Sequence, residues 1–363
     1  MLFSTLFGYT LSNITRHPVT KRKIGIALSG GVDSTACALL LREHHEVKGF
    51  FMQLAQPDFA AQKTRVQAVA DKLGIPLQII DLQQEFEQRV LNYFSGSYYR
   101  GLTPNPCVIC NKEIKFGLFM EAILHAGMDR MATGHYAKII KSEDRYHLHC
   151  GDDPQKDQSY FLSRLTQQQL AKVIFPLGET TKKNTYHFVE EHGFDNFHGQ
   201  ESQDVCFLEN RQITAFLADR ARSKDTEGAI VSTSGKVLGH HQGLFHYTIG
   251  QRKGLGISSA APLYVIGLDA PGNRVIVGSN EELFNKRIRV QNLHWLADRK
   301  PDLTSSYQVR IRYSHRGATA RLVVDDEGCG DIIFDAPQRA VTPGQFAVIY
   351  HDTELLGSGI ILE

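Results

Sequence analysis

The chain has 363 residues, of which 42% are hydrophobic, so it can bury a large core and divide into two or three domains. Lysine plus arginine number 40 and aspartate plus glutamate 39, a balance that neither requires nor excludes nucleic acid as a partner. No run of about 18 apolar residues is present, which excludes a membrane-spanning helix. We therefore expect a soluble globular protein with no membrane partner.

The first residues, 1–22, contain no acidic side chain and carry Arg16, Lys21 and Arg22 among Ser, Thr and Leu. This composition weakly resembles an organelle-targeting leader but lacks the arginine density of one. We expect a disordered N-terminal extension over 1–22 and a cytoplasmic protein rather than an organellar one. Six cysteines without a secretory signal indicate a reducing compartment, where Cys serves more often as nucleophile or ligand than as a structural bridge.

Residues 23–210 alternate apolar runs with amphipathic stretches. The pattern predicts strands and helices in turn, over 24–28, 33–44, 47–54, 60–73, 77–81 and 83–94. Such alternation is typical of a parallel α/β sheet, in which ligands bind beyond the carboxyl ends of the strands. Residues 29–34, Met52 and residues 132–135 should leave the sheet at that edge and form one nucleotide pocket.

The sequence changes character after about residue 210. Gly-rich turns and short alternating strands, such as 264–268 and 274–277, predict a small β-rich central domain over 211–282. Later β-branched and aromatic runs predict a C-terminal β-barrel over 283–363, with strands over 307–313, 318–324, 331–334 and 346–351. The expected fold class is α/β: a parallel-sheet nucleotide-binding domain, then a β-rich domain, then a barrel.

The turn after the first strand reads Ser-Gly-Gly-Val-Asp-Ser. Two glycines permit close approach of the backbone to an anion, while helix-start amides and the hydroxyls of Ser29, Ser34 and Thr35 supply donors. No Walker lysine follows, which argues against terminal phosphoryl transfer. The turn resembles the PP-loop of ATP pyrophosphatases, which cleave ATP between the α and β phosphates. The alternative is an ordinary glycine-rich strand-to-helix turn. The expected ATP-binding residues are Ala27, Leu28, Ser29, Gly30, Gly31, Val32, Asp33, Ser34, Met52 and Gly134.

Asp33 has two interpretations. Beside bound phosphates, its carboxylate would hold Mg²⁺ or orient the phosphates. Near a helix start, the carboxylate would instead cap the helix by accepting hydrogen bonds from the first backbone amides, since Asp suits that position. Both roles can coexist in one residue.

A second site is predicted around the segment Thr-Pro-Asn-Pro-Cys-Val-Ile-Cys-Asn-Lys over 103–112. Cys107 and Cys110 lie near a helix start, where the positive end of the helix dipole should lower a thiol pKa. Lys112 and Lys115 should act in the same direction. A reactive sulfur is therefore expected in this segment.

Two further cysteines need separate interpretations. Cys206 lies in a short stretch, expected to be extended, near the end of the α/β region, and the sequence does not show whether it meets Cys110. Cys37 lies within the apolar first helix and is interpreted as buried and inert. A buried inert cysteine is the alternative for each of the others as well.

Several motifs occur in a fixed order along nearly the whole chain: Ser-Gly-Gly-Val-Asp-Ser, Thr-Pro-Asn-Pro, Cys-Asn-Lys-Glu-Ile-Lys-Phe, Ala-Thr-Gly-His-Tyr-Ala, Lys-Asp-Gln-Ser-Tyr-Phe-Leu, Phe-Pro-Leu-Gly, Val-Cys-Phe and Tyr-Thr-Ile-Gly-Gln-Arg-Lys-Gly-Leu-Gly. The set resembles the tRNA-specific 2-thiouridylase family. The resemblance implies a tRNA-uridine 2-sulfurtransferase, which replaces the 2-oxygen of the wobble uridine with sulfur and converts ATP to AMP and pyrophosphate.

The resemblance also implies a mechanism. Adenylation makes the uracil 2-oxygen a good leaving group, with ATP and Mg²⁺ as cofactors. In the family's usual account Cys206 carries a persulfide, received from a sulfur-relay protein or a cysteine desulfurase, and Cys110 resolves it. Cys110 and Cys206 are therefore the expected catalytic residues. We expect the protein to be a monomer.

One position departs from the family. The commoner motif has Asp where this chain has Cys107, so no carboxylate role can be carried over. Cys107, Cys110 and Cys206 are instead able to hold three irons of a [4Fe–4S] cluster, with the fourth iron open to sulfide. Zinc normally takes four ligands, and neither Cys150 nor Cys329 lies in a paired spacing. Persulfide and cluster chemistry both remain open.

The resemblance implies tRNA contacts at Asn105, Pro106, Cys107, His135, Lys156, Asp157, Gln158, Arg312, Tyr313 and Gln345. Residues 286–321 carry many Lys and Arg against only Asp298 and Asp302, which predicts a basic surface for RNA phosphates. A solvated charged face is the alternative for any one arginine. His240, His241 and His246 lack nearby ligand partners, so we interpret them as structural or RNA-facing.

Two other functions remain. The first is a different PP-loop enzyme that adenylates a carboxylate for amide formation, which the cysteines and the tRNA-matching motifs argue against. The second is a non-catalytic tRNA-binding protein that retains the fold, which the intact Asp33, Cys110 and Cys206 disfavour.

Overall fold

The computed structural model describes residues 21–195, 205–208, 213–221, 227–325 and 327–362. They belong to two compact units. The first comprises Met1–Glu87, Cys107–Glu209 and Thr353–Leu355, and the second comprises Gln88–Pro106, Asn210–Asp352 and Leu356–Glu363. Within the described part of the chain, none of the helices combines the length and the apolar character needed to cross a membrane. The expected disorder of the N-terminal extension concerns residues 1–20, which lie outside the described residues.

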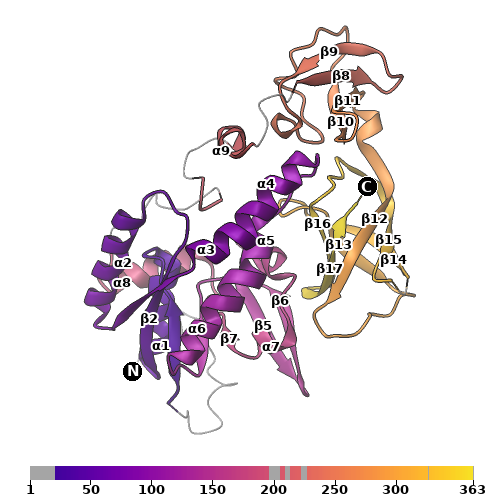
Figure 1. The fold of residues 1–363 in the computed structure, drawn as a ribbon. Coiled ribbons are helices and arrows are strands. Elements are labelled where there is room, and N and C mark those ends of the chain that lie inside the picture. Colours follow the sequence, from indigo (N-terminus) through magenta and orange to yellow (C-terminus); the bar gives the residue numbers. More distant parts are fainter. Residues whose placement is uncertain (1–20, 196–204, 209–212, 222–226, 326, 363) are drawn as a thin grey trace. The chain divides into compact units, whose positions relative to one another are not determined.

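Five parallel strands form the central sheet of the first unit, in the order β3-β2-β1-β4-β7 (Figure 1). Their bounds are Lys23–Ala27 for β1, Glu46–Gln53 for β2, Leu77–Asp81 for β3, Arg130–Ala132 for β4 and Val173–Ile174 for β7. The chain moves outward from β1 through β2 to β3 and then returns to the other side of β1 at β4. The connections after β1 and β4 therefore lead in opposite directions along the sheet, which makes the carboxyl edge between these strands a switch point, where such sheets bind ligands. The expected parallel sheet is confirmed.

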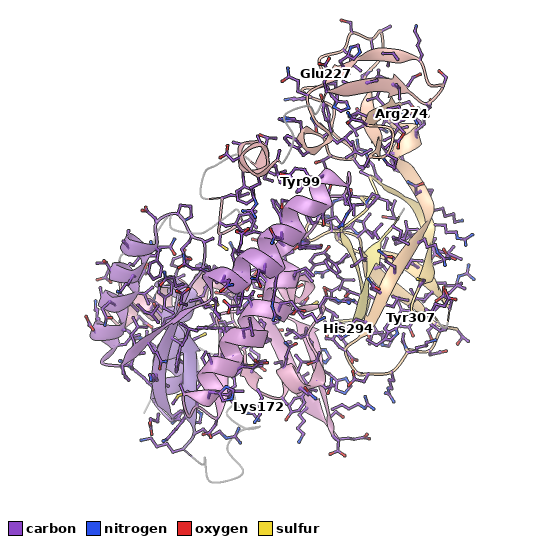
Figure 2. All side chains as sticks on the ribbon, in the orientation of Figure 1. Tyr99, Lys172, Glu227, Arg274, His294 and Tyr307 are labelled. Atoms are coloured by element: carbon purple, nitrogen blue, oxygen red, sulfur yellow. The ribbon has the colours of Figure 1, made fainter. Side chains whose placement is uncertain are left out.

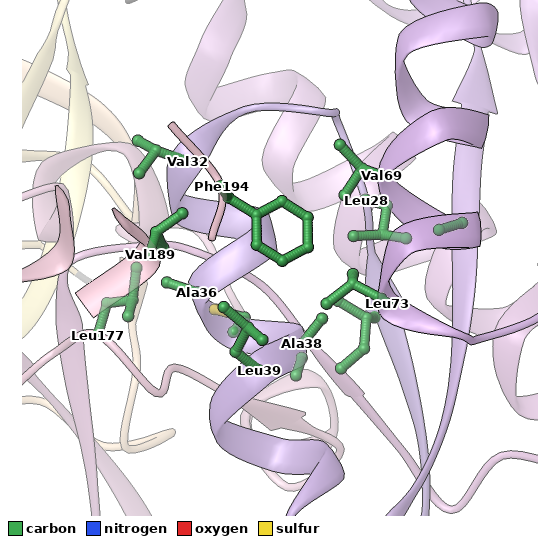
Figure 3. Close-up of a cluster of buried hydrophobic side chains, with 14 of the residues drawn as sticks. Leu28, Val32, Ala36, Ala38, Leu39, Val69, Leu73, Leu177, Val189 and Phe194 are labelled. Carbon is green, nitrogen blue, oxygen red and sulfur yellow. The ribbon is translucent and has the colours of Figure 1, made fainter. Parts of the chain in front are cut away.

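Helices α1 (Val32–Arg42), α2 (Phe59–Leu73) and α8 (Lys182–Glu191) share one apolar core with this sheet. Figure 3 shows the ring of Phe194 among aliphatic side chains of this core. Each fully buried Leu, Val or Phe side chain stabilises the fold by about 1.5–3 kcal/mol. Helix α2 ends at Gly74, whose left-handed φ of 67° lets its N–H bond carbonyls of the last turn. This core fixes the carboxyl edge of the sheet.

Two helical runs contain π-helical turns, which insert an extra residue per turn. The first consists of α3 (Gln83–Phe86), η2 (Glu87–Leu91) and α4 (Asn92–Tyr99), so the helix expected over 83–94 is confirmed and continues to Tyr99. The second consists of α5 (Pro106–Cys110), η3 (Asn111–Phe119) and α6 (Met120–His125). Pro106 suits the first helical position because its fixed φ is helical. The N–H that proline lacks would have no hydrogen-bond partner within the helix there.

The remaining elements of the first unit are short: the hairpin of β5 (Ala137–Ser142) and β6 (Arg145–Cys150), the 3₁₀ turn η4 (Ser159–Leu162) and helix α7 (Gln167–Leu170). Thr166 and Gln169 form a capping box at the start of α7. Strand β6 pairs with Glu354 and Leu355, which explains why these C-terminal residues belong to the first unit.

Four strands form the β-rich sheet of the second unit, in the order β10-β11-β8-β9. Their bounds are Gly228–Ser232 for β8, Val237–His241 for β9, Tyr264–Asp269 for β10 and Arg274–Gly278 for β11. Buried Ile230, Val265 and Val275 contribute to a separate core. The guanidinium of Arg274, labelled in Figure 2, pairs with Asp269 at 2.6 Å across the β10–β11 hairpin. Helix α9 (Ile213–Arg220) and the 3₁₀ turns η5 (Leu244–His246) and η6 (Glu281–Leu283) complete this region.

Six strands of the second unit form a closed barrel, in the order β12-β15-β14-β13-β16-β17 with β17 paired back to β12. Their bounds are Phe284–Trp295, Ser306–Arg310, Ala318–Val324, Gly330–Arg339, Phe346–His351 and Glu354–Ile361 for β12 to β17. Ile288, Val309 and Phe334 are fully buried inside it, as expected for the inward positions of a small barrel. The fold class of parallel sheet, β-rich domain and barrel is confirmed.

Candidate active site

The loop after β1 holds its own shape through hydroxyl groups. Ser34 Oγ donates to the Gly31 carbonyl at 3.0 Å and accepts from the Ser29 N–H at 3.2 Å. Thr35 Oγ1 donates to the same carbonyl at 3.1 Å. Gly30 has a φ of 74°, a left-handed value that favours glycine. The loop is therefore preformed, and the hydroxyls of Ser34 and Thr35, expected to face an anion, hold the loop instead.

The start of α1 carries no side-chain cap in the described structure, because its N-cap residue is Gly31. The Asp33 carboxylate bonds elsewhere. Its Oδ1 accepts from the Tyr136 hydroxyl at 2.8 Å, and Lys182 Nζ lies 2.8 Å from both oxygens. The interpretation of Asp33 as a helix cap is therefore wrong. An anion at this helix start would meet backbone amides with no side chain to displace.

The ion pair of Asp33 and Lys182 joins α1 to the start of α8. The Lys182 side chain is 12% exposed and that of Asp33 33% exposed, so water screens the pair less than it screens a surface pair. Thr181 caps α8, and Asp153 accepts from the Lys182 N–H at 3.0 Å, which fixes the backbone of the lysine. A cation therefore reaches the nucleotide loop from 149 residues further along the chain.

The loops after β1 and β4 approach each other closely. A Cβ added at Gly134 would lie 2.7 Å from Asp33 Cβ and 2.9 Å from its carbonyl carbon, so only glycine fits there. Met52 lies at the end of β2, half-buried, and its carbonyl accepts from Gln56 Nε2 at 3.0 Å. Gly134 and Asp33 thus lie side by side at the sheet edge, as one pocket requires. Their role in ATP binding stays a prediction.

Besides Met52, three of the expected ATP-binding residues have apolar side chains. Leu28 and Val32 are 2% and 5% exposed and lie in the core drawn in Figure 3, while Ala27 is half-buried. Contacts from Leu28 and Val32 to a nucleotide would therefore come from their backbone atoms.

The thiols of Cys107, Cys110 and Cys206 lie within electrostatic range of one another. Burial is the main cause that raises the pKa of Cys107 to about 11; a negative charge on Cys206 raises it too, whereas Lys115 lowers it. The pKa of Cys110 is also raised, first by burial and then by Cys206, again against Lys115. Lys115 acts in the expected direction, but the expectation of a lowered thiol pKa is wrong, because desolvation outweighs the single cation that acts on the thiols.

Cys206 and Cys37 occupy contrasting environments. Cys206 is exposed and lies in a turn over 206–208, so the expected extended stretch is wrong. Cys37 is 0% exposed within α1, and burial raises its thiol pKa, which confirms its interpretation as inert. All six cysteines carry free thiols. Cys206 is the exposed one of the six.

No group of three His, Cys, Asp or Glu side chains in the described ranges is arranged to hold a metal ion. Cys107, Cys110 and Cys206 are all described, so their geometry does not match a set of cluster ligands. The iron–sulfur hypothesis therefore lacks support in this structure. Magnesium differs, because it commonly takes one or two carboxylates together with substrate phosphates. Asp33 beside the anion loop fits that pattern.

His135 is buried against the rings of Phe116 and Phe175, at centroid distances of 5.5 and 5.6 Å. Its Nδ1 lies 2.7 Å from Thr133 Oγ1, and its Nε2 lies 3.5 Å from Lys115 Nζ. Burial, together with Lys115, lowers the pKa of His135 well below 6.5, so the ring is neutral at pH 7. Because an ammonium group only donates, Nε2 accepts and Nδ1–H donates to Thr133. A tRNA contact by His135 stays a prediction.

The residues expected to contact tRNA at 156–158 differ in what their side chains do. Asp157 is 5% exposed, and its Oδ1 accepts from the N–H groups of Gly151 at 3.2 Å and Ser159 at 3.1 Å. Gln158 Oε1 accepts from the Tyr136 N–H at 3.1 Å. Lys156 is partly exposed. Asp157 and Gln158 thus bond to the protein itself.

In the second unit, Gln345 holds the segment that leads to Asn105 and Pro106. Its Nε2 donates to the Thr103 carbonyl at 2.9 Å. The Gln345 side chain, expected to contact tRNA, therefore hydrogen-bonds to the backbone next to Asn105 and Pro106, two other residues expected to contact tRNA. Roles of Gln345, Asn105 and Pro106 in tRNA binding stay predictions.

Arg312 and Tyr313 follow strand β13. Arg312 Nη1 donates to the Arg339 carbonyl at 3.3 Å, and Tyr313 is 40% exposed. An exposed aromatic ring beside a guanidinium suits stacking on an unpaired base. Their contact with tRNA also stays a prediction.

The basic surface expected over 286–321 is partly neutralised. Arg287 pairs with Asp331 at 2.6 Å, and Arg289 pairs with Asp325 at 3.3 Å. Both aspartates lie later in the chain, and only the fold brings them to the arginines: Asp331 lies in β15, which pairs with β12, and Asp325 follows β14. The local charge is therefore less positive than the sequence window predicts.

His241 is 1% exposed and structural, as one of the two interpretations requires. Its Nδ1 accepts from the Gly243 N–H at 3.1 Å, so its Nε2–H donates to the Asn273 carbonyl at 3.1 Å. Burial lowers the pKa values of His241 and of His246. His240 is exposed.

Two residues of this region are not identified by the sequence pattern: Tyr136 and Lys182. Each lies within or just after a motif, at Ala-Thr-Gly-His-Tyr-Ala and Phe-Pro-Leu-Gly. The motifs indicate where function concentrates, but only the fold shows which side chains converge on Asp33 and on the thiols.

A glycine-rich anion loop at the switch point of a parallel sheet, followed by a β-rich domain and a barrel, defines an α/β nucleotide-binding protein with two β modules. Three family profiles match in the same order: "tRNA methyl transferase HUP domain" over 22–210, "tRNA methyl transferase PRC-barrel domain" over 214–279 and "Aminomethyltransferase beta-barrel domain" over 285–361.

Curated relatives identify the family within that class. The tRNA-specific 2-thiouridylase MnmA of Desulfotalea psychrophila is 56% identical over 342 residues, covering 94% of this chain and 99% of the relative. Its counterpart from Syntrophotalea carbinolica is 42% identical over 347 residues, covering 94% and 98%. The chain belongs to the tRNA-specific 2-thiouridylase family. A solved structure described as a predicted subunit of tRNA methyltransferase, from Methanocaldococcus jannaschii, matches at a TM-score of 0.31 and 16% identity over 47% of this chain and 75% of that one, too distant to support an argument.

Proposed function

We propose that this protein catalyses ATP-dependent 2-thiolation of the wobble uridine of tRNA. The observation that carries the proposal is a juxtaposition within the first unit. An anion loop with Asp33 and no Walker lysine lies in the same unit as three thiols that act electrostatically on one another. Family membership supports the same reaction.

The nucleotide step uses the loop after β1. The amides at the start of α1 would bind the phosphates of ATP, while Lys182 supplies a positive charge beside them. When bound, Mg²⁺ supplies charge neutralisation on the phosphates, with Asp33 as its protein ligand. The uracil 2-oxygen attacks the α-phosphorus, and pyrophosphate leaves with the electron pair of the broken P–O bond.

The sulfur step uses the exposed and the partly buried thiol in sequence. Cys206 receives a sulfur atom as a persulfide from a sulfur-relay protein or a cysteine desulfurase. Its terminal sulfur attacks carbon 2 of the adenylated base, and AMP leaves with the C–O electron pair. The Cys110 thiolate then attacks Cys206 Sγ, which releases 2-thiouridine and leaves a disulfide for an external dithiol to reduce.

The substrate and the setting complete the proposal. tRNA would bind through Lys156, Arg312, Tyr313 and the 105–107 segment, as the family resemblance implies. The protein would act as a monomer in the cytoplasm. The profile names mention methyl transfer, but that reaction needs neither ATP cleavage nor a set of thiols, so these features favour thiolation.

The test is a thiolation assay with tRNA, Mg-ATP and a persulfide donor. We expect AMP and 2-thiouridine in equal amounts, detected by chromatography and by retardation on a mercury-containing gel. Asp33→Ala should abolish thiolation while the Kd for tRNA stays within a few-fold, because the carboxylate serves phosphates rather than RNA.

The cysteine variants separate the sulfur mechanisms. Cys110→Ser and Cys206→Ser should be inactive, whereas Cys107→Asp, which restores the commoner motif, should stay active without iron. Iron-dependent activity lost together in all three variants would instead support a cluster. ATP–pyrophosphate exchange that depends on a small carboxylic acid, without thiolation, would indicate another adenylating enzyme. Binding of tRNA without either reaction would indicate a non-catalytic tRNA-binding protein.

A further inference from the structure

Tyr136 lies between the Asp33 carboxylate and the loop over 151–158, all within the first unit. Its hydroxyl donates to Asp33 Oδ1 at 2.8 Å. A second hydrogen bond joins the same phenol oxygen to Thr185 Oγ1 at 2.9 Å. The hydroxyl is therefore held from two sides and aimed at one oxygen of the carboxylate that we place beside the phosphates.

The phenol is suited to a fixed donor role. Tyr136 is 2% exposed, so protein groups rather than water satisfy its hydroxyl. A protonated phenol at 2.8 Å from a carboxylate oxygen makes a charge-assisted hydrogen bond, which restricts the orientation of the carboxylate.

The backbone of Tyr136 is held by the 151–158 loop. The Tyr136 N–H donates to Gln158 Oε1 at 3.1 Å, and the Gln158 N–H donates to the Tyr136 carbonyl at 3.0 Å. Gly151 also packs against Tyr136, since a Cβ there would lie 2.8 Å from the Tyr136 carbonyl oxygen. The loop thus holds both backbone polar groups of Tyr136.

Asp157 fixes the loop itself. Its Oδ2 accepts from Ser159 Oγ at 3.0 Å, and its Oδ1 accepts from the Gly151 and Ser159 amides at 3.2 and 3.1 Å. Because the side chain is buried and its oxygens are taken by the loop, Asp157 sets the position of Gly151 against Tyr136. A direct RNA contact would have to displace these bonds.

We propose that Tyr136 is a positioning residue for Asp33, and that Gln158, with Asp157 behind it, acts through Tyr136 on the nucleotide step rather than by contacting tRNA. The proposal rests on the proposed function, because it takes Asp33 to serve the phosphates of ATP. It assigns two residues of the Lys-Asp-Gln motif to the ATP site.

The experiment measures the Kd for Mg-ATP without tRNA by calorimetry, the kcat for AMP formation at saturating tRNA, and the Kd for tRNA. Tyr136→Phe deletes only the hydroxyl, and Gln158→Met deletes the amide while keeping the length of the side chain. Matched controls are Tyr146→Phe in β6 and Gln155→Met in the same loop.

Tyr136→Phe should weaken Mg-ATP binding or lower kcat by about ten-fold to a hundred-fold, as expected for loss of a hydrogen bond to a charged group. Gln158→Met should cause a smaller loss, about two- to ten-fold, in the same parameter. Both should leave the Kd for tRNA within two-fold, roughly the scatter expected when no contact is lost. The controls should match the wild type.

A double variant tests whether the two residues act on one route. In the Tyr136→Phe background, Gln158→Met should cause no further loss, because the hydroxyl through which it acts is gone. Additive losses would overturn that part of the proposal. A Gln158→Met protein with weakened tRNA binding and unchanged ATP parameters would overturn it as well.

Two checks keep the test decisive. Thermal unfolding shows whether Tyr136→Phe is folded. If it is not, the Kd for Mg-ATP, the kcat and the Kd for tRNA of Gln158→Met decide between a role in the ATP site and an RNA contact. Failure of the wild type to thiolate tRNA would refute the proposed function, whereas thiolation by the wild type and by Tyr136→Phe at equal rates would refute only the role of Tyr136.

Discussion

Lys115 is the one cation in the described structure that acts on both Cys107 and Cys110. It also lies 3.5 Å from His135 Nε2. Its neighbour Lys112 lies near Glu113 instead, at 3.4 Å. A single ammonium group therefore opposes the burial that keeps these thiols protonated, and its position decides how readily a thiolate forms.

We predict that Lys115→Met raises the pKa of Cys110 and Cys107 further, because the cation favours the thiolate and burial does not. The measurement is the rate of alkylation by iodoacetamide against pH in a variant whose other cysteines are replaced. The midpoint should move to higher pH in Lys115→Met. Lys112→Met is the matched control, and an equal shift there would show that general charge, not Lys115, sets the thiol pKa.

The burial of these thiols could not be predicted from residue types. The sequence places them near a helix start and two lysines, which favours a low pKa. The fold instead surrounds the thiols, and desolvation outweighs the dipole and the cation. The same limit applies to Asp33, because its partners Tyr136 and Lys182 come from distant segments.

At the scale of elements, the loops after β1 and β4 depend on glycine at one contact. Gly134→Ala would place a methyl group 2.7 Å from Asp33 Cβ and 2.9 Å from its backbone carbon. Because backbone must shift, we predict a loss of about 1–3 kcal/mol in the free energy of unfolding. Displacement of Asp33 should also lower the rate of AMP formation, by at least about ten-fold for a misplacement on the order of 1 Å.

Urea unfolding and the rate of AMP formation check this prediction. Gly96→Ala in α4 is the control, because nothing lies within 4 Å of a Cβ there and alanine favours a helix. Unchanged AMP formation in a folded Gly134→Ala protein would contradict the close-approach argument.

Of the five strands of the parallel sheet, the short β4 and β7 are not predicted, whereas β1, β2 and β3 are predicted within one residue, because their apolar runs and flanking turns carry a strong local signal. Strand β17 carries a weak one, since Gly357 and Gly359 lower strand propensity. In the fold, a Cβ at Gly357 would lie 2.4 Å from the His294 carbonyl oxygen. The glycines are required because β17 packs closely against β12. This contact is part of the tertiary structure and cannot be predicted from the local sequence pattern.

At the scale of the whole molecule, histidines with lowered pKa values occur in both units. Burial lowers the pKa of His135 in the first unit and of His241, His246 and His315 in the second. The unfolded chain has the ordinary value near 6.5. Below that pH the unfolded state binds more protons than the folded state. The free energy of unfolding therefore decreases as the pH is lowered.

We predict that the free energy of unfolding is steady above about pH 7 and declines below about pH 6.5, by up to about 1.4 kcal/mol per pH unit for each histidine that stays neutral. Urea unfolding between pH 5 and 8 measures the slope. His241→Gln should flatten it, whereas His187→Gln on the exposed face of α8 should not. A slope unaffected by either variant would assign acid sensitivity to other groups.

The segment Gln88–Pro106 is synthesised early but belongs to the unit whose other parts are Asn210–Asp352 and Leu356–Glu363. The amide of Gln345 that bonds the Thr103 carbonyl lies 242 positions later in the chain. During translation, the segment that leads into Cys107 therefore cannot form its hydrogen bond with Gln345 until the barrel has been synthesised. The order of synthesis thus delays assembly of the second unit until nearly the whole chain has left the ribosome.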